Sequence, residues 1–539
     1  MMKRMLLLMG FWMSGTVAWA GPLERWVYAP VNLLVPEQIT RLEALMERAR
    51  TAGYTHFLLA DSKFSRLGEM EERYFDHLAR VKQKAGALGL QLVPAVFPVG
   101  YSNDMLSQDP NLAEGLPVRA ALFEVKQGEA RLMADPPVSL PRLAERKRWG
   151  FVDDNLTVDG EGVKLTDGQG GNARFMMKVK VAPFRHYHAS IRVKTQGFKG
   201  VPEIKVLVPG TDRALCYTGL KVKPTQQWTV HHVTFNSLET TAVNLYFGVW
   251  GAGPGTLWLS DPGLEEAGPV NLLRRPGCPL EVKTLDGKVL VEGKDYESLA
   301  DPRLGNQPYA GEYEVWHTAP PLRTRLSEGT RLLVSWYHPH VIHEGQVCAS
   351  VSEPAFMKLL ERQAQQVHGA WGAGSYMMSH DEWRVMGWDV AALSRSLTPG
   401  QVTADNVKRC TGFLETVNQG GRVMVWSDMF DPHHNAVNHY YLVNGDLTGS
   451  WLGLDPKVVI MNWNFGARTK SLSFFSGRGH QQILSGYYDA GPDQIKDWLA
   501  AARGVPGVIG VMYTTWQHNY TDLEAFAGHV TAWEEGQRN

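Results

Sequence analysis

Two hydrophobic patterns alternate along this chain. Near its start, short apolar runs at 25–31, 55–61 and 90–98 are separated by segments in which apolar residues recur at helical spacing, at 36–52 and 69–88. Strands that alternate with helices in this way are typical of a parallel sheet or barrel. The first part of the chain is therefore predicted to supply three parallel strands.

The same rhythm of strand and helix returns in the last third of the chain. Helical stretches at 353–369, 404–418 and 492–503 accompany further apolar runs. Three strands before the middle region and five after it give the number found in a TIM barrel, so the fold class is predicted as α/β with a (β/α)8 barrel. The run 331–339 (RLLVSWYHP) could instead be a barrel strand, and this alternative stays open. The five later strands are expected at 375–382, 423–428, 458–463, 482–489 and 508–516.

The middle of the chain has a different pattern. From about 150 to 267, short runs of alternating apolar and polar residues are separated by Gly, Pro, Asp and Asn. This pattern is typical of an antiparallel β-sandwich, and a smaller β segment follows it. The predicted organisation is a signal peptide at 1–20, barrel strands 1–3 at 21–135, an inserted β-sandwich at 136–270, a small β module at 271–342, and barrel strands 4–8 with the catalytic residues at 343–539.

The N-terminus reads as a targeting segment. Lys3 and Arg4 precede an apolar run at 5–17, and the Ala-Trp-Ala at 18–20 resembles a cleavage site. We expect a cleavable signal peptide, Met1 to Ala20, and a secreted or periplasmic protein. No later stretch reaches 18 apolar residues, so no membrane span is expected in the mature chain.

Composition narrows the classes of partner. The chain has 539 residues with 54 Lys and Arg against 55 Asp and Glu, so the basic surface of a nucleic-acid-binding protein is not expected. Its 18 Trp and 18 Tyr suit amphipathic ligands such as sugars. The cysteines match no metal-ligand spacing, and both disulfides and free buried thiols stay open for Cys216, Cys278, Cys348 and Cys410.

Two histidine-rich stretches are candidate metal sites, and the second of them contains His433, His434 and His439. His338, His340, His343 and Glu344 lie close together in sequence, but Pro339 breaks any helix that would align them. They are interpreted as polar loop residues. We therefore predict no metal and no cofactor.

Candidate chemistry gathers where the barrel strands end. The active site of such a barrel lies at the C-terminal ends of its strands. Carboxylates that face one another over an aromatic floor are the equipment for glycoside hydrolysis, and a neighbouring charge raises the pKa of the proton donor. A glycan or glycoconjugate substrate is therefore predicted. The candidate catalytic residues are Asp381 and Glu382, and the candidate substrate-binding residues are Asp61, His380, Trp426, Asp428, Trp463, Tyr487, Asp489 and Trp516.

Over residues 350–520 the ordered strand ends resemble glycoside hydrolase family 20, the β-N-acetylhexosaminidases. The resemblance rests on the motifs at 379–382 (SHDE), 425–431 (VWSDMFD), 487–489 (YYD) and 516–518 (WQH). It implies a retaining mechanism in which the 2-acetamido oxygen of the sugar attacks the anomeric carbon. It also implies that Asp381 orients the acetamido group, that Glu382 is general acid and then base, and that Tyr487 binds the acetamido oxygen. In the same way it implies that Trp426, Trp463 and Trp516 wall the pocket and that Asp489 binds a sugar hydroxyl.

The chain departs from this family at other strand ends. The expected Arg of the first strand is absent from 29–32 (APVN), and the last strand lacks its Glu. Two further readings therefore stay open. Glu382 could be the acid and base of a double displacement in which Asp428 or another strand-end carboxylate is the nucleophile. Alternatively, the barrel could bind glycans without cleaving them.

The middle region resembles carbohydrate-binding modules of the jelly-roll type, on the run 255–261 (GTLWLSD). The resemblance suggests Tyr187, Trp228 and Trp250 as residues that stack on sugars, although each could instead belong to the sandwich core. The oligomeric state is left open.

Overall fold

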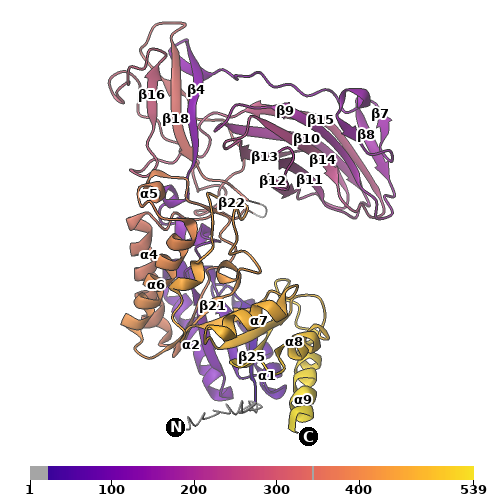
Figure 1. The fold of residues 1–539 in the computed structure, drawn as a ribbon, viewed down its shortest axis with the longest axis vertical. Coiled ribbons are helices and arrows are strands. Elements are labelled where there is room, and N and C mark those ends of the chain that lie inside the picture. The colour runs from indigo at the N-terminus through magenta and orange to yellow at the C-terminus, as the bar shows by residue number, and fades with distance from the viewer. Residues whose placement is uncertain (1–21, 343–344, 539) are drawn as a thin grey trace, which may run out of the picture.

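The computed structural model describes residues 22–342 and 345–538, so the expected signal peptide at Met1 to Ala20 lies outside the described residues. Within these ranges eight parallel strands close into a barrel in the order β1-β2-β3-β19-β21-β23-β24-β25. The predicted TIM barrel is therefore confirmed (Figure 1). Its strands are β1 Glu24–Pro30, β2 His56–Ala60, β3 Gln91–Val96, β19 Ser375–Met378, β21 Arg422–Trp426, β23 Val459–Asn462, β24 Gln482–Tyr487 and β25 Val508–Thr514.

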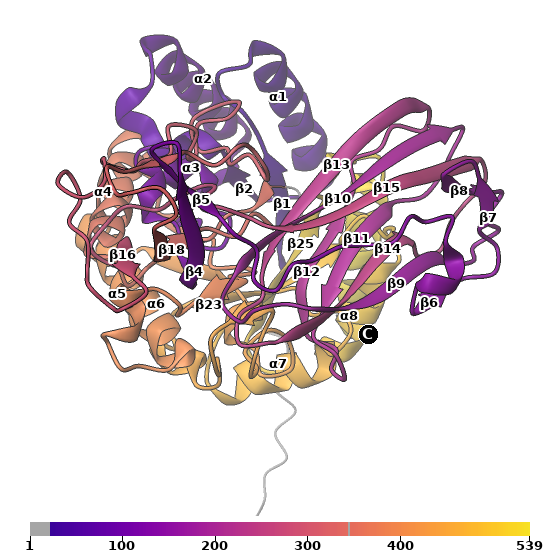
Figure 2. The same cartoon turned by 90° about the horizontal axis from the view of Figure 1, so that it is seen from above.

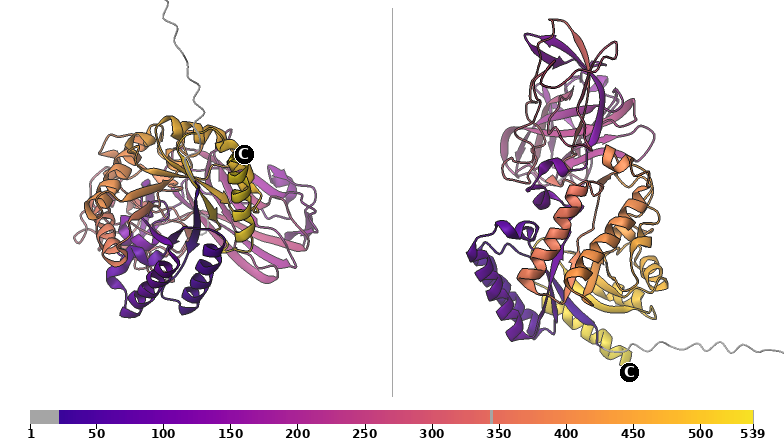
Figure 3. Two further views of the ribbon diagram at one scale, coloured as in Figure 1. Left: turned by 90° about the horizontal axis from the view of Figure 1, so that it is seen from below. Right: turned by 90° about the vertical axis from the view of Figure 1, so that its left-hand side faces the viewer.

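The helices form a ring outside these strands, as the view from below shows (Figure 3). Local sequence explains them: α1 has Pro36 in its first turn and buries Ile39, Leu42 and Met46 at helical spacing, and α6 starts with a capping box between Thr398 and Gln401. Among the described residues the helices are α1 Pro36–Thr51, α2 Glu72–Leu88, α3 Asn103–Leu106, α4 Pro354–Trp371, α5 Val390–Leu393, α6 Pro399–Val417, α7 Arg468–Gly477, α8 Gln494–Ala502 and α9 Leu523–Arg538. None of these helices is long and apolar enough to cross a membrane.

The insert contains a sandwich of two antiparallel five-stranded sheets, in the orders β13-β10-β15-β8-β7 and β12-β11-β14-β9-β6. Alternate residues of each strand point inward, and Tyr187 of β10 is fully buried among them. A sugar-stacking role for Tyr187 is therefore wrong. The strands are β6 Phe151–Val152, β7 Thr157–Asp159, β8 Gly162–Thr166, β9 Ala173–Lys180, β10 His186–Gln196, β11 Pro202–Leu207, β12 Ala214–Gly219, β13 Gln226–Asn236, β14 Ala242–Val249 and β15 Thr256–Glu266.

A second, smaller sheet has the order β16-β18-β4-β5-β17. Its strand β18 covers the RLLVSWYH run and pairs antiparallel with β4, so the alternative that placed this run in the barrel is wrong. The pairing also assigns 116–132 to this sheet, whereas the sequence placed 21–135 in the barrel. The partner strand lies more than 200 residues away, beyond the reach of any local pattern. The strands are β4 Leu116–Lys126, β5 Glu129–Leu132, β16 Glu281–Thr284, β17 Leu322–Arg323 and β18 Arg331–His338.

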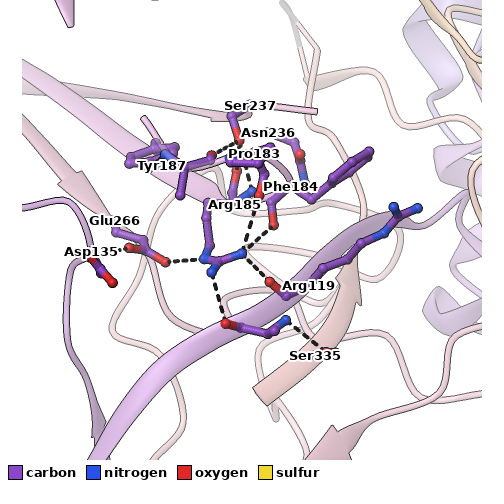
Figure 4. Close-up of polar contacts among 12 residues, drawn as sticks. Arg119, Asp135, Pro183, Phe184, Arg185, Tyr187, Asn236, Ser237, Glu266 and Ser335 are labelled. Atoms are coloured by element: carbon purple, nitrogen blue, oxygen red, sulfur yellow. Dashed lines mark hydrogen bonds and ion pairs between the residues drawn. The ribbon is translucent and has the colours of Figure 1, made fainter. Parts of the chain in front are cut away.

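The sandwich and the small sheet lie next to each other at one end of the barrel, where the insert leaves after β3 (Figures 1 and 2). Arg185 of the sandwich joins them. Its guanidinium forms an ion pair with Glu266 at 3.1 Å and donates to the carbonyl oxygens of Arg119 and Ala120 on β4 (Figure 4). These contacts fix the orientation of the sandwich on the small sheet. All four cysteines are buried and free.

Candidate active site

The C-terminal ends of the barrel strands surround a cavity of about 580 Å³. This volume lies within the roughly 300–1,000 Å³ of typical small-molecule sites. Residues from all eight barrel strands or the loops after them line it, as expected for a TIM-barrel active site. The lining residues relevant to chemistry are Tyr28, Asp61, Tyr101, Asp381, Glu382, Trp426, Trp463, Tyr488 and Trp516.

Aromatic rings form the walls of this cavity. Trp463 and Tyr488 lie parallel, with ring centroids 5.6 Å apart and an interplanar angle of 3°. Tyr28 meets Trp516 edge-on at 4.9 Å, and Trp426 lies 6.1 Å from Trp516. Flat faces with polar edges suit the apolar face of a sugar ring. The structure thus brings together all three tryptophans that the sequence predicted.

The Asp381 carboxyl belongs to a residue that lines the cavity. Within the described part of the chain, no other side chain donates a hydrogen bond to it. Burial raises its pKa well above the usual range, and the nearby carboxylates of Asp428 and Glu382 raise it further. Asp381 therefore holds a proton more readily than an ordinary aspartic acid.

The neighbouring Glu382 has a different environment. Arg384 forms an ion pair with its Oε1 at 2.7 Å, and the Tyr101 hydroxyl donates to its Oε2. Gln346 supports this arrangement by donating to the Glu382 carbonyl oxygen and accepting from Arg384. A guanidinium and a phenol thus both bind this one carboxylate, in charge-assisted hydrogen bonds. Two adjacent carboxyls in one cavity thus differ in their electrostatic surroundings.

Backbone geometry sets the two side chains apart. Glu382 has a left-handed φ of 47°, which breaks the alternation that a strand would impose. Gly100, after β3, packs against the peptide between Asp381 and Glu382, because a Cβ at this position would overlap the Asp381 carbonyl oxygen. The close approach of glycine backbone therefore helps to hold the pair.

Asp428 lies beneath the pair and does not line the cavity. Three donors reach its carboxylate: the Glu382 backbone N–H at 2.8 Å, Asn435 Nδ2 at 2.9 Å and Trp463 Nε1 at 3.2 Å. Burial raises its pKa. Because these donors occupy its oxygens, Asp428 positions Glu382 and Trp463. The structure does not support the predicted direct contact of Asp428 with substrate.

The tyrosine that reaches the cavity is Tyr488, and the prediction of Tyr487 was off by one residue. The Tyr487 ring stacks on Tyr513 at 4.1 Å, and its hydroxyl donates to Asp522 at 3.1 Å. Tyr487, Tyr488 and Asp489 all have left-handed φ angles, of 69°, 50° and 57°. The chain therefore turns at this strand end and presents the second tyrosine instead of the first.

Of the three other predicted substrate-binding residues, Asp489 and His380 do not line the cavity. Asp489 accepts from the Thr515 hydroxyl at 2.6 Å and from the Trp516 backbone N–H at 2.8 Å, so it supports a wall residue. His380 is fully buried and bonds Asn406 at 2.9 Å, away from the cavity. Asp61 alone of the three lines the cavity.

Four residues of the site were not among the predicted site residues: Tyr28, Tyr101 and Tyr488, which line the cavity, and Arg384, which binds Glu382 beside it. Tyr101 follows the third strand and Tyr488 the seventh, where the strand-end rule could have found them. Arg384 is close to Asp381-Glu382 in sequence, but its pairing with Glu382 depends on the turn between them. Tyr28 lies inside β1, so only the barrel geometry reveals it.

The histidines considered as metal ligands are dispersed. His338 is buried and stacks on His186 of the sandwich at 3.7 Å, and Asn236 contacts its Nε2 at 3.0 Å. His343 and Glu344 lie outside the described residues. Across 22–342 and 345–538, no three His, Cys, Asp or Glu side chains come together in a way that could hold a metal ion.

No family model matches the chain, and no curated protein matches it. Among solved structures it is similar to a chitobiase from Flavobacterium johnsoniae, with 8% identity, a TM-score of 0.39, and coverage of 95% of this chain and 50% of that one. A rhamnosidase from Novosphingobium sp. PP1Y gives 11% identity, a TM-score of 0.35, and coverage of 96% and 59%. A carbohydrate-binding module of a Cellvibrio mixtus lichenase, solved with cellotriose, gives 14% identity, a TM-score of 0.19, and coverage of 25% and 100%. The chain spans 50% and 59% of the two enzymes' lengths, so its function is inferred from the geometry of its own cavity.

Proposed function

We propose that the protein is a glycoside hydrolase whose Asp381-Glu382 pair cleaves a β-linked 2-acetamido sugar. One observation carries the proposal: a single aromatic-walled cavity holds two adjacent carboxyls in unlike environments. Surroundings that push two carboxyls toward different protonation states assign an acid and a base. Cleavage of a glycosidic bond needs both.

The substrate-assisted route uses the acetamido group as nucleophile. Its oxygen attacks the anomeric carbon as the bond to the leaving oxygen breaks. Asp381 accepts the acetamido N–H, and Tyr488 donates to the acetamido oxygen in the role first expected of Tyr487. Glu382 protonates the leaving oxygen and then, as a carboxylate, removes a proton from the attacking water.

A second route is favoured by the contacts of Glu382. Arg384 and Tyr101 hold its carboxylate oxygens in place, whereas burial raises the pKa of Asp381. In this route Asp381 protonates the leaving oxygen and the Glu382 carboxylate attacks the anomeric carbon to form a glycosyl-enzyme, which water then hydrolyses. Asp428 is the weaker candidate nucleophile because three donors already occupy its oxygens.

Turnover of aryl β-glycosides separates these possibilities. The panel contains the N-acetylglucosaminide, N-acetylgalactosaminide, glucoside and galactoside, tested with wild type, Glu382→Gln and the exposed control Glu71→Gln. Activity confined to the acetamido sugars supports substrate assistance. Activity on plain glycosides, with a 2-deoxy-2-fluoro sugar trapped on Glu382, supports the second route. No turnover of any member by wild type contradicts the proposal and leaves glycan binding without cleavage.

We also propose that the protein acts after export, on the targeting pattern of residues 1–20. Expression of the full chain in a bacterium should then yield a mature protein that begins at Gly21. Intact mass of the protein from the periplasm and medium checks this. An uncleaved chain found only in the cytoplasm would contradict it.

A further inference from the structure

The outer face of one sandwich sheet carries a continuous row of side chains. Strand pairing aligns Tyr217 of β12 with Lys205 of β11, Lys205 with Tyr246 of β14, Tyr246 with Met176 of β9, and Met176 with Phe151 of β6. Their neighbours along each strand point inward to the core, so the row faces out. At about 4.8 Å per strand the row is about 19 Å long, enough for several linked sugars.

Aromatic rings and charges alternate on this face. Trp250 lies 6.1 Å from Tyr246, with Lys205 Nζ over its ring at 3.7 Å. Lys205 also pairs with Glu203 at 3.0 Å. The Arg174 guanidinium lies 5.7 Å from the centre of the Trp250 ring. Rings that can stack on a sugar, next to charged groups that can bind its hydroxyls, are the chemistry that recognises a glycan.

The row leads to the catalytic cavity. Tyr217, at the β12 end, contacts the Tyr441 ring at 5.4 Å in the loop after β21. The adjacent Tyr440 lies close enough to the cavity that the charges of Arg384 and Glu382 alter its pKa, which burial raises overall. Figures 1 and 2 both place the β12 end of the sandwich next to the barrel and the β7 and β8 end farthest from it.

The contacts of Arg185 and of Tyr217 keep the sandwich in a fixed position on the barrel. Arg185 holds the sandwich on β4, and the contact between Tyr217 and Tyr441 holds the β12 edge on the barrel. A chain bound along the row would therefore meet the cavity at one defined place. The path runs from Trp250 through Tyr246 and Tyr217 to Arg384.

We propose that this face, defined by Arg174, Lys205, Tyr217, Tyr246 and Trp250, is a second glycan-binding site that holds the distal part of the chain cleaved in the barrel. The inference rests on the proposed function and deepens it. The substrate class is then an oligosaccharide or polysaccharide of several residues, and a single terminal sugar on a small aglycone uses only the cavity.

The opposite sheet offers a matched control. Trp228 on β13 is 39% exposed and also lies near a cation, with Arg192 5.3 Å from its ring. The outer face of that sheet packs elsewhere against the insert, through His188 on Trp316 at 3.7 Å and His186 on His338. Trp228 therefore shares the chemistry of Trp250 but lies on the other sheet.

The first test compares a long and a short substrate. For wild type, Trp250→Ala, Trp250→Phe and Trp228→Ala, kcat/KM is measured on the aryl glycoside of the accepted sugar and on the β-linked hexamer of that sugar. Trp250→Ala should lower the ratio of hexamer to aryl glycoside by about 2- to 12-fold, the range of one aromatic stacking contact, and Trp250→Phe should restore most of it. Trp228→Ala should leave the ratio unchanged. Equal ratios in all four proteins would overturn the inference.

A second readout does not depend on cleavage. Affinity gel electrophoresis of the full chain in glycol chitin, hydroxyethyl cellulose and xylan measures binding directly. Retardation of wild type by one polymer, reduced in Trp250→Ala and in Tyr246→Ala but not in Trp228→Ala, supports the site even if no aryl glycoside is hydrolysed. If no polymer retards wild type, or if all variants are retarded equally, the second site is refuted while the proposed hydrolase activity stands on its own test.

Discussion

Replacing Glu382 by Gln tests the central carboxyl pair with little change of shape. If Glu382 transfers the proton to the leaving group, its loss should cost about 10²- to 10⁴-fold in rate. This corresponds to roughly 3–6 kcal/mol of activation free energy at about 1.4 kcal/mol per factor of ten. The matched change Asp381→Asn removes the other carboxyl and leaves Glu382 paired with Arg384.

The same substitution also affects stability. Arg384 is only 8% exposed and loses its charged partner in Glu382→Gln. Breaking a fully buried pair costs roughly 3–5 kcal/mol, but the Glu382 side chain is 24% exposed and Arg384 keeps its hydrogen bonds to Tyr101 and Gln346. We therefore expect a smaller loss, about 1–2 kcal/mol. Rates must be divided by the folded fraction, measured by circular dichroism at the assay temperature.

The assay varies the leaving group. A dinitrophenyl group departs without a proton, whereas a methylumbelliferyl group benefits from one. The variant that lacks the proton donor should lose far less activity on the first substrate than on the second. The variant that lacks the nucleophile or the orienting group should lose similar activity on both. This pattern decides whether Glu382 or Asp381 is the acid.

Two results would refute the reasoning. One is a loss of less than about tenfold in both variants once the folded fraction is taken into account, because neither carboxyl would then take part in the chemistry. The other is a large loss explained wholly by unfolding, with normal rates per folded molecule.

Three further predictions follow from single contacts. Gly100→Ala should lower kcat by about 10²-fold or more while the secondary structure stays normal, because the added methyl group displaces the Asp381 peptide and small misplacements of reacting groups are costly. An unchanged kcat would contradict the close packing of Gly100 on this peptide. Tyr488→Phe should reduce kcat/KM on acetamido sugars by about tenfold, the value of roughly one hydrogen bond, and Tyr487→Phe should not; equal effects would contradict the assignment. Burial and a neighbouring carboxyl raise the pKa of Glu114 to about 8 from its ordinary 4.5, so it is protonated in the fold and stability falls as pH rises from 4.5 through about 8. Urea unfolding should therefore show Glu114→Gln gaining at least about 1 kcal/mol relative to wild type between about pH 6 and about pH 9; a constant difference would contradict the shift.

Much of the barrel could be predicted from the sequence because its signals are local. Apolar runs and helical spacing are set by neighbours within a few turns of chain, and they located all eight barrel strands. The edge of the insert could not be located in this way. The strand at 116–126 pairs with 331–338, and antiparallel pairing across so many residues leaves no trace in either segment alone.

The residues of the candidate site were likewise predictable only in part. The carboxyl ends of parallel strands converge, so sequence order alone placed Asp381, Glu382 and the three tryptophans in one cavity. Whether a residue at a strand end faces the cavity depends on backbone angles after the strand, and a left-handed turn there exchanged Tyr487 for Tyr488.

The sequence by itself determined which residue types reach the mouth of the barrel. Only the tertiary structure decided their surroundings: Arg384 and Tyr101 bind the Glu382 carboxylate, no side chain among the described residues binds the Asp381 carboxyl, and three donors occupy Asp428. The physical reason is that strand periodicity is a property of the local chain. Protonation and hydrogen bonding depend on groups that approach through space from other strands and loops.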